Sequence, residues 1–201
     1  MAERAQQQMD VLFPDMPTEW IWHRTRNDGY STIPRTLPIA MQVINNLTKG
    51  KPAGHTLFCL WARSPDHPLV TIENPATFAH EAAFTGERAV HTWRKKMKEL
   101  TDLNFILPRK GPSGDYHYVL LANPNTAVEW LRANGRVQDE LYARFKDRVI
   151  DIGAYGDIEA AHALWAQQKA KEAEEAKKNN DEPAPTKKSK PRKSQSDKGQ
   201  K

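Results

Sequence analysis

The sequence has little that would suit a secreted, disulfide-stabilised or membrane-spanning protein. It holds 201 residues and one cysteine, Cys59, so a disulfide within the chain is impossible. Its longest apolar runs, such as residues 119–122, are far shorter than the roughly 20 residues that cross a bilayer. No charged start with an apolar run and a small-residue cleavage site lies near Met1. We therefore expect a cytoplasmic protein with no membrane partner.

The patterns of common enzyme and metal sites are also missing. Residues 50–56, GKPAGHT, lack the Lys-Ser/Thr ending of a phosphate-binding loop, and no Gly-x-Ser-x-Gly elbow occurs. His55 and Cys59 are spaced as i and i+4, but structural zinc usually takes four ligands from paired cysteines and histidines. Cys59 lies in an apolar run and is better interpreted as a core residue. We expect no enzymatic activity, no cofactor and no metal.

Charge is unevenly distributed along the chain. The formal net charge is +5, and residues 169–201 account for all of it, with eleven Lys or Arg against six Asp or Glu. Residues 179–201 are rich in Lys, Ser and Pro, and such a composition cannot bury enough apolar surface to offset the entropy of ordering. This segment is predicted to be a disordered, Lys-rich tail.

A second basic cluster lies inside the otherwise neutral body of the protein. Residues 87–110 contain seven basic and three acidic residues, a local net charge of +4, so the rest of residues 1–168 sums to −4. Such an asymmetry is expected of a surface that binds a polyanion while the remainder stays soluble. The alternative interpretation is an ordinary solvated helix face.

Apolar spacing and turn residues predict a mainly α fold with a small β-hairpin, an α+β class. Residues 1–33 have little periodicity and read as a loosely structured N-terminal arm, with Trp20 and Trp22 as its anchors to the core. Helices are predicted over residues 38–48, 52–63, 75–84, 87–103, 124–135 and 137–150 and from 157 onward, and strands over 69–72, 105–107 and 116–121. Asn74-Pro75 and Asn123-Pro124 are strong helix starts, and Thr85 is the predicted N-cap of the helix over 87–103.

The helix over 87–103 is amphipathic. Ala89, Val90, Trp93, Met97 and Leu100 share one side at 100° per residue, which assigns Trp93 to the core. The other side is basic, and the following hairpin has Arg109 and Lys110 in its predicted turn, residues 108–114. The candidate DNA-binding residues are Arg88, His91, Thr92, Arg94, Lys95, Lys98, Arg109 and Lys110. Those near the helix start (Arg88, His91 and Arg94) suit base edges, whereas Lys95 and Lys98 suit phosphates.

The order of these elements over residues 37–121 resembles the winged helix-turn-helix family. The resemblance implies a winged-helix DNA-binding domain over residues 34–122, with residues 75–84 as the supporting helix, 87–103 as the recognition helix and 107–116 as the wing. Residues 79–106, AHEAAFTGERAVHTWRKKMKELTDLNFI, also resemble segments of small replication, partition and regulatory proteins of bacterial plasmids and mobile elements.

These resemblances imply a nucleoid-associated, sequence-specific binder of double-stranded DNA, acting as a transcriptional regulator or a replication or partition accessory. The helical extension over residues 123–178 lies outside the family pattern and offers a surface for a homodimer or for another protein. Two alternatives stay open. One is a winged-helix module that docks an acidic protein, and the other is an RNA-binding or ribosome-associated protein, which the Lys-rich tail would permit.

Overall fold

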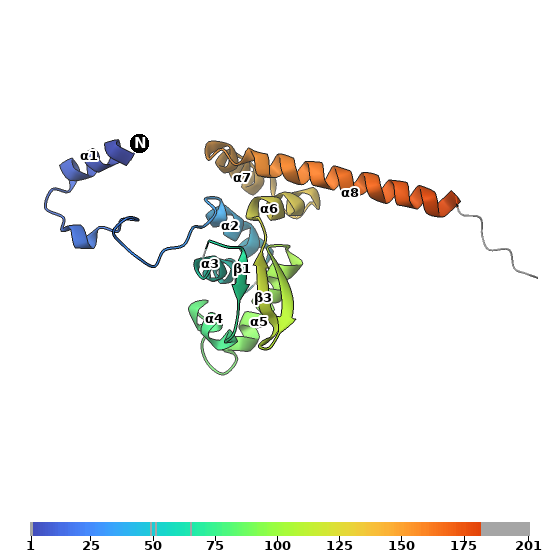
Figure 1. Cartoon of the computed structure of the whole chain (residues 1–201), viewed down its shortest axis with the longest axis horizontal. Helices are drawn as coiled ribbons and strands as arrows, with labels where there is room; N and C mark the ends of the chain where they lie inside the picture. The colour runs from blue at the N-terminus through green and yellow to red at the C-terminus, as the bar shows by residue number, and fades with distance from the viewer. Residues whose placement is uncertain (1, 49, 51, 65, 182–201) are drawn as a thin grey trace, which may run out of the picture. The chain divides into compact units, whose positions relative to one another are not determined.

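The chain folds into helices with one small antiparallel sheet (Figure 1). The computed structural model describes residues 2–48, 50, 52–64 and 66–181. The elements in chain order are α1 (Ala2–Leu12), a 3₁₀ turn η1 (Thr18–Trp20), α2 (Leu37–Leu47), α3 (Gly54–Ala62), β1 (Leu69–Thr71), α4 (Pro75–Glu81), α5 (Ala89–Asp102), β2 (Ile106–Gly111), β3 (Gly114–Leu121), α6 (Pro124–Ala133), α7 (Asp139–Asp151) and α8 (Tyr155–Asp181). The predicted α+β class is confirmed.

Two helices begin where Asn-Pro pairs predicted them. The Asn74 side chain accepts a hydrogen bond from Ala76 N at 3.0 Å at the start of α4, and Asn123 accepts one from Asn125 N at 2.9 Å at the start of α6. In each case the proline takes the first helical position, where a backbone donor is not needed. Local chemistry therefore determines both starts.

The sheet has the strand order β1-β3-β2, so the last strand in sequence lies in the middle. β3 pairs with β1 at Val70 opposite Val119 and with β2 at Ile106 opposite Leu121, both antiparallel. Along β3 the buried residues His117, Val119 and Leu121 alternate with exposed ones. One face of the sheet is thus part of the core.

The core is continuous from the sheet into the helices that precede it and those that follow it along the chain. Its largest fully buried side chains include Trp93 and Phe105, together with Phe145 from α7. Helix α2 packs on α3, α6 and α7, and α3 packs on α4 and α5. Helices α6 and α7 share this core. The domain boundary that was expected at residue 123 therefore lies inside one packed unit, which extends to Ile158.

Polar contacts reinforce the packing of α6 on its neighbours. Thr36 Oγ1 donates to Asn125 Oδ1 at 2.6 Å, and both residues are buried. Tyr142 of α7 donates its hydroxyl to Glu129 Oε2 of α6 at 2.7 Å. Burial and this bond to a carboxylate raise the pKa of Tyr142 to about 12. The first contact ties α6 to the segment before α2, and the second joins α7 to α6.

The ends of the chain differ from the prediction. Residues 2–12 form helix α1 rather than loose structure, and Trp20 and Trp22 are exposed instead of anchored in the core. Helix α8 runs to Asp181, which places residues 179–181 in a helix rather than in the tail. Residues 182–201, the rest of the predicted disordered tail, lie outside the described residues.

Candidate nucleic-acid interface

Helix α4 ends at Glu81, three residues earlier than predicted, and a connection over residues 82–88 that contains two residues with positive φ leads to α5. Ala83 has φ of 61° and Gly86 has φ of 79°, a conformation that glycine adopts without steric cost. The helix begins at Ala89, two residues later than predicted, with Arg88 as its N-cap residue and no side-chain cap. The expected cap by Thr85 is therefore wrong, because the backbone of Gly86 to Arg88 continues the turn.

The inner face of α5 is the predicted one. Ala89, Trp93, Met97 and Leu100 are buried. The Trp93 ring lies 6.4 Å from the ring of Phe78 in α4 and 6.0 Å, edge-on, from that of Tyr116 in β3. The assignment of Trp93 to the core is confirmed, and its ring joins α4, α5 and the hairpin.

The outer face of α5 carries the candidate side chains. Arg88, His91, Arg94, Lys95 and Lys98 are exposed, and Thr92 is half-buried. At 100° per residue the exposed side chains lie on one arc of about 120° around the helix, with the i,i+4 row of Arg94 and Lys98 at one edge, Arg88 at the other, and the row of His91 and Lys95 between them. Within the part of the chain that the structure describes, Arg88, Arg94 and Lys95 form no ion pair. These cations are thus available to a partner.

Lys96 does not belong to the basic surface. It is 5% exposed, and its ammonium donates to both carboxylate oxygens of Glu99, at 2.9 and 2.7 Å. A buried ammonium requires such a partner, because desolvation of an unpaired charge is costly. The charge of Lys96 is neutralised within the helix. Counting it in the cluster over residues 87–110 overstated the number of exposed cations by one.

The row of Arg94 and Lys98 faces the hairpin. A Cβ atom added to Gly114, at the start of β3, would lie 3.9 Å from Nη2 of Arg94. Burial raises the pKa of Tyr116 in β3, while the nearby cations Lys98 and Arg94 act in the opposite direction. Lys98 itself forms an ion pair with Asp102 at 2.7 Å, which raises the pKa of its ammonium. Helix α5 and the hairpin therefore share one continuous surface.

Arg109 and Lys110 are exposed, but they do not lie in a turn. Both belong to β2, which continues through Pro108 to Gly111, and the turn consists of Pro112 and Ser113. Arg109 lies opposite Tyr118 of β3, and the register shifts between Arg109 and Gly111. Arg109 and Lys110 therefore lie along the edge strand β2, and not at the tip of the hairpin as predicted.

The tip of the hairpin is attached to the end of β1 through residues that the sequence analysis did not single out. His117 is buried, with its Nδ1 atom 3.1 Å from the carbonyl oxygen of Ile72 and 2.8 Å from Ser113 Oγ. Ser113 Oγ also donates to the Ile72 carbonyl. A Cβ atom on Gly111 would lie 2.3 Å from the His117 ring, so only glycine fits there. Gly111 and Gly114, which flank the turn, are the sequence signal that could have indicated the close approach of the His117 ring to the backbone.

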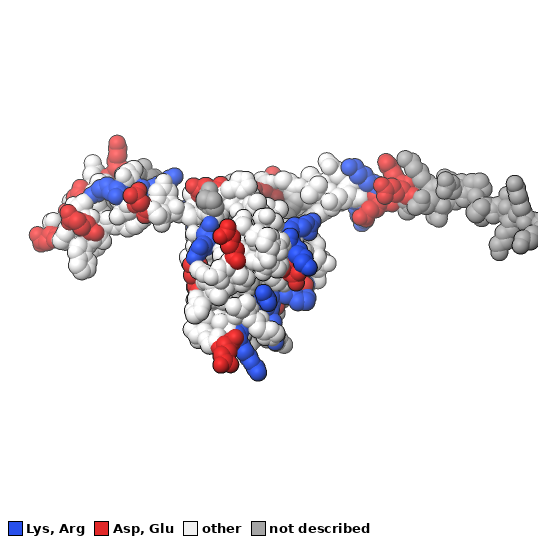
Figure 2. Space-filling model, turned by 60° about the horizontal axis from the view of Figure 1, so that its bottom comes forward, with Lys and Arg blue, Asp and Glu red and all other residues white. Residues whose placement is uncertain are grey.

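Figure 2 shows the distribution of charge on one face. Basic side chains gather along one side of the compact body with a few acidic ones among them, and much of the remaining visible surface of the body is uncharged. For residues 87–110, a net charge of +4 makes a modest basic surface rather than a broad positive field.

Other candidate sites were tested against the structure. Cys59 is buried in α3, with its sulfur 3.7 Å from His55 Nε2, and burial raises the pKa of its thiol. Among the described residues, no group of three or more His, Cys, Asp or Glu side chains is placed to hold a metal ion. Over the same residues, no helix combines the length and apolar character that a bilayer span requires.

Comparison of the chain with protein-family models, with curated proteins and with solved structures gives no match. The functional argument therefore depends on the geometry and charge of the residues themselves.

Proposed function

We propose that this protein binds double-stranded DNA, with α5 in the major groove and the β2–β3 hairpin against the sugar-phosphate backbone. The observation that carries the proposal is the closeness of the exposed α5 cations to the hairpin, where a Cβ atom added to Gly114 of β3 would lie 3.9 Å from Nη2 of Arg94. A helix that enters the major groove needs an apolar face to hold it and a polar face that reaches phosphates and base edges. Helix α5 has both.

The arrangement of elements supports this proposal. Helices α4 and α5 follow each other through the connection over residues 82–88, and a three-stranded sheet of order β1-β3-β2 has its hairpin next to α5. This order of elements is the one that the resemblance to the winged helix-turn-helix family implies. Under this binding mode Arg88 and the row of His91 and Lys95 contact base edges and one phosphate, and the row of Arg94 and Lys98 contacts the backbone near the hairpin.

The structure changes one residue assignment. Arg94 was expected among the base-reading residues, but its guanidinium is directed to the hairpin side of α5. Arg88 lies at the helix start, where recognition helices usually contact bases, and about 120° around the helix from Arg94; His91 follows Arg88 by one turn. The proposal therefore assigns sequence preference chiefly to Arg88 and His91. A regulator or a replication or partition accessory would use such a surface.

Salt dependence of binding to a labelled duplex is the direct test. Each phosphate that a cation neutralises contributes roughly −0.9 to the log-log slope of affinity against salt, so about four to six contacts give a slope of roughly −4 to −5. Arg136→Ala is a matched control, since Arg136 is exposed, forms no ion pair with the described residues and lies outside the surface. A flat salt response, or equal losses for Arg88→Ala and Arg136→Ala, contradicts DNA binding through α5.

Competition distinguishes duplex DNA from the two other polyanions. Random duplex, structured RNA and an acidic peptide are added to the labelled complex at equal phosphate or carboxylate concentration. Preferential displacement by duplex supports the proposal. Displacement by RNA or by the acidic peptide alone supports RNA binding or protein docking instead.

A further inference from the structure

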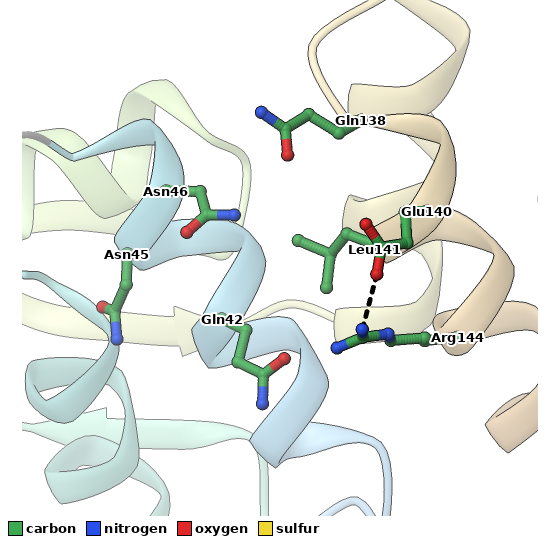
Figure 3. Close-up of a pocket in the computed structure, with 7 residues that line it drawn as sticks. All are labelled: Gln42, Asn45, Asn46, Gln138, Glu140, Leu141 and Arg144. Atoms are coloured by element: carbon green, nitrogen blue, oxygen red, sulfur yellow. Dashed lines mark hydrogen bonds and ion pairs between the residues drawn. The ribbon is translucent and has the colours of Figure 1, made fainter.

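A groove runs along α2 on the side that packs neither on the sheet nor on α5. One end is an apolar pocket of about 440 Å³ lined by Ile33, Leu37, Pro38, Met41 and Phe58, with His55 beside them. The other end is a polar pocket of about 380 Å³ between α2 and α7 (Figure 3). The two pockets share Gln42 and Asn45, so they form one surface.

The polar end of this groove is lined by amides. Gln42 and Asn46 of α2 point into the space opposite Gln138 and Leu141, while Asn45 points to the other side of α2 (Figure 3), where its Oδ1 accepts from Gly54 N at 2.9 Å. The only charged side chains in this lining, Glu140 and Arg144, form an ion pair at 2.5 Å. Side-chain amides both donate and accept, as a peptide backbone does. An apolar pocket beside a row of amides suits an extended peptide with apolar anchors.

The N-terminal arm of the chain supplies such apolar anchors, from the last turn of α1 through η1 to Trp22. Val11, Leu12, Phe13 and Met16 are exposed, as are Trp20, at 83%, and Trp22, at 62%. Isolated exposed apolar residues are normal in proteins, but six within twelve residues indicate an interaction segment. Pro14 and Pro17 favour an extended backbone and reduce the entropy lost on binding.

We propose that the arm of one chain, residues 9–22, docks into the α2 groove of a second copy, and that the exchange is reciprocal. Each copy carries both the segment and the groove, so mutual docking closes as a two-fold dimer in which both apolar surfaces are buried. The proposal goes beyond DNA binding and does not depend on it, because none of the groove residues belongs to α5 or the hairpin.

The place where the arm leaves the body favours docking of the arm in a second copy over docking in the groove of its own chain. Ser31 Oγ donates to the carbonyl oxygens of Trp61 and Ser64, at 3.2 and 2.7 Å, and Thr32 N donates to Asp66 Oδ1 at 3.0 Å. These bonds hold residues 31–32 at the C-terminal end of α3. His55 and Phe58, which line the groove, lie in the first two turns of α3, at its other end. An arm that docked in its own chain would have to reverse its direction within residues 22–30.

Residues 22–30 already have their own local structure. The Trp22 and Tyr30 rings pack edge-on with centroids 6.3 Å apart, and the guanidinium of Arg24 lies over the Tyr30 ring at 5.3 Å. His23 N donates to Asn27 Oδ1 at 2.6 Å. A reversal in this segment would break these contacts, while a second copy receives the arm without breaking them.

The experiment is sedimentation of the full chain over a wide range of concentration, with variants of each surface. We expect a monomer–dimer equilibrium in the unaltered protein. Phe13→Ser with Trp20→Ser should raise the dimer dissociation constant about tenfold or more, because buried aromatic anchors dominate interfaces. These side chains are exposed in the monomer, so their loss should leave the melting temperature unchanged at concentrations well below the dimer dissociation constant. Phe58→Asp should have the same effect from the groove side.

Ile150→Asp is the matched control, since Ile150 is an exposed apolar residue of α7 outside the groove. It should leave the dimer intact. A monomer at every concentration overturns the proposal. So does a dimer that Ile150→Asp dissociates and the arm variant does not, because that result places the interface on the helices after Asn123.

Disulfide trapping identifies the docked pair directly. In a Cys59→Ala background, chains with Phe13→Cys are mixed with chains bearing Met41→Cys and oxidised mildly. A cross-linked species of twice the chain mass, absent when Ile150→Cys replaces Met41→Cys, supports exchange between copies. A chain with both Phe13→Cys and Met41→Cys that cross-links only within itself overturns it.

Discussion

Trp93 and Arg94 are adjacent in sequence and lie in opposite environments, which makes them the most informative pair of residues for the proposed function. Trp93 is 1% exposed between two aromatic rings, and Arg94 extends from the outer face toward the hairpin. Side-chain truncation at the two positions should therefore affect different properties of the protein.

Arg88→Ala should weaken binding to the preferred duplex by about 1–3 kcal/mol, the scale of a lost base contact. Arg94→Ala should instead weaken binding to every duplex by a similar factor and reduce the salt slope by roughly 1. Neither change should alter the free energy of unfolding by much. Trp93→Ala should lower the free energy of unfolding by about 3–5 kcal/mol, since it leaves a large cavity. Urea denaturation and duplex titration measure the two effects. A stable Trp93→Ala variant that no longer binds DNA would require that α5 present its other face to the duplex.

Helical periodicity allowed the two faces of α5 to be predicted from the sequence, but it could not predict the state of Lys96. At 100° per residue, Lys96 lies only 60° around the helix from the buried Trp93, at the edge of the buried face. A net charge calculated from the sequence treats every lysine as a solvated cation. Only the structure shows that Glu99, one turn later, partners the ammonium and makes burial tolerable.

At the scale of elements, the helix starts were predictable and the hairpin turn was not. Asn74-Pro75 and Asn123-Pro124 determine α4 and α6 through contacts within three residues. Pro108 and the nearby glycines suggested a long turn, but β2 is the edge strand of the sheet, where a proline without an N–H is tolerated. The actual turn depends on His117 and Ile72, which are 45 residues apart in sequence.

The close approach of Gly111 to His117 leads to a prediction for the hairpin. Gly111→Ala places a methyl group 2.3 Å from the ring, so the ring must move and lose its contacts with Ile72 and Ser113. We expect a loss of about 1–3 kcal/mol in the free energy of unfolding, as in other overpacked sites.

His117→Ala makes room for that methyl group. The double variant should therefore be less destabilised than the sum of the two single variants, by a coupling of about 0.5 kcal/mol or more in urea denaturation. Additive losses would mean that Gly111 is required for a reason other than the His117 ring.

The contact between α6 and α7 has a consequence at high pH. The pKa of Tyr142 is about 12 in the folded protein, and the ordinary value of 10.0 applies to the unfolded chain. Below pH 10 both states hold the proton and the contribution to stability is complete. Between pH 10 and pH 12 the unfolded chain releases its proton first, so the folded state loses stability. The difference between 10.0 and about 12 corresponds to roughly 2.7 kcal/mol, which solvent screening at this half-buried hydroxyl reduces to about 2 kcal/mol at most.

Tyr142→Phe has no proton to lose and is the reference for this effect. The difference in free energy of unfolding between the unaltered protein and Tyr142→Phe should fall from pH 10 upward and level off above pH 12. Parallel curves would show that the hydroxyl titrates alike in the folded and unfolded states.

At the scale of the whole molecule, the two basic regions should have separate roles in DNA binding. Residues 182–201 hold seven Lys or Arg and two Asp or Glu in a Pro- and Ser-containing segment. Charge of this kind follows a phosphate backbone without reading bases. Deleting these residues should weaken binding to every duplex by a similar factor and lower the salt slope, while the ranking of sequences stays the same. Selection of bound sequences before and after deletion measures this, and a changed ranking would assign base contacts to the tail.

The central position of β3 has a consequence for how the hairpin can move. Since β3 is hydrogen-bonded to β1 on one edge and to β2 on the other, the inner strand of the hairpin is also the middle of the body's sheet. The hairpin therefore cannot open without opening the fold. In hydrogen–deuterium exchange, the β3 amides should exchange only through global unfolding, and the outer edge of β2 should exchange earlier. A surface held this way presents Arg109 and Lys110 at fixed positions, so under the proposed binding mode the duplex, through its own bending and groove width, makes the adjustment.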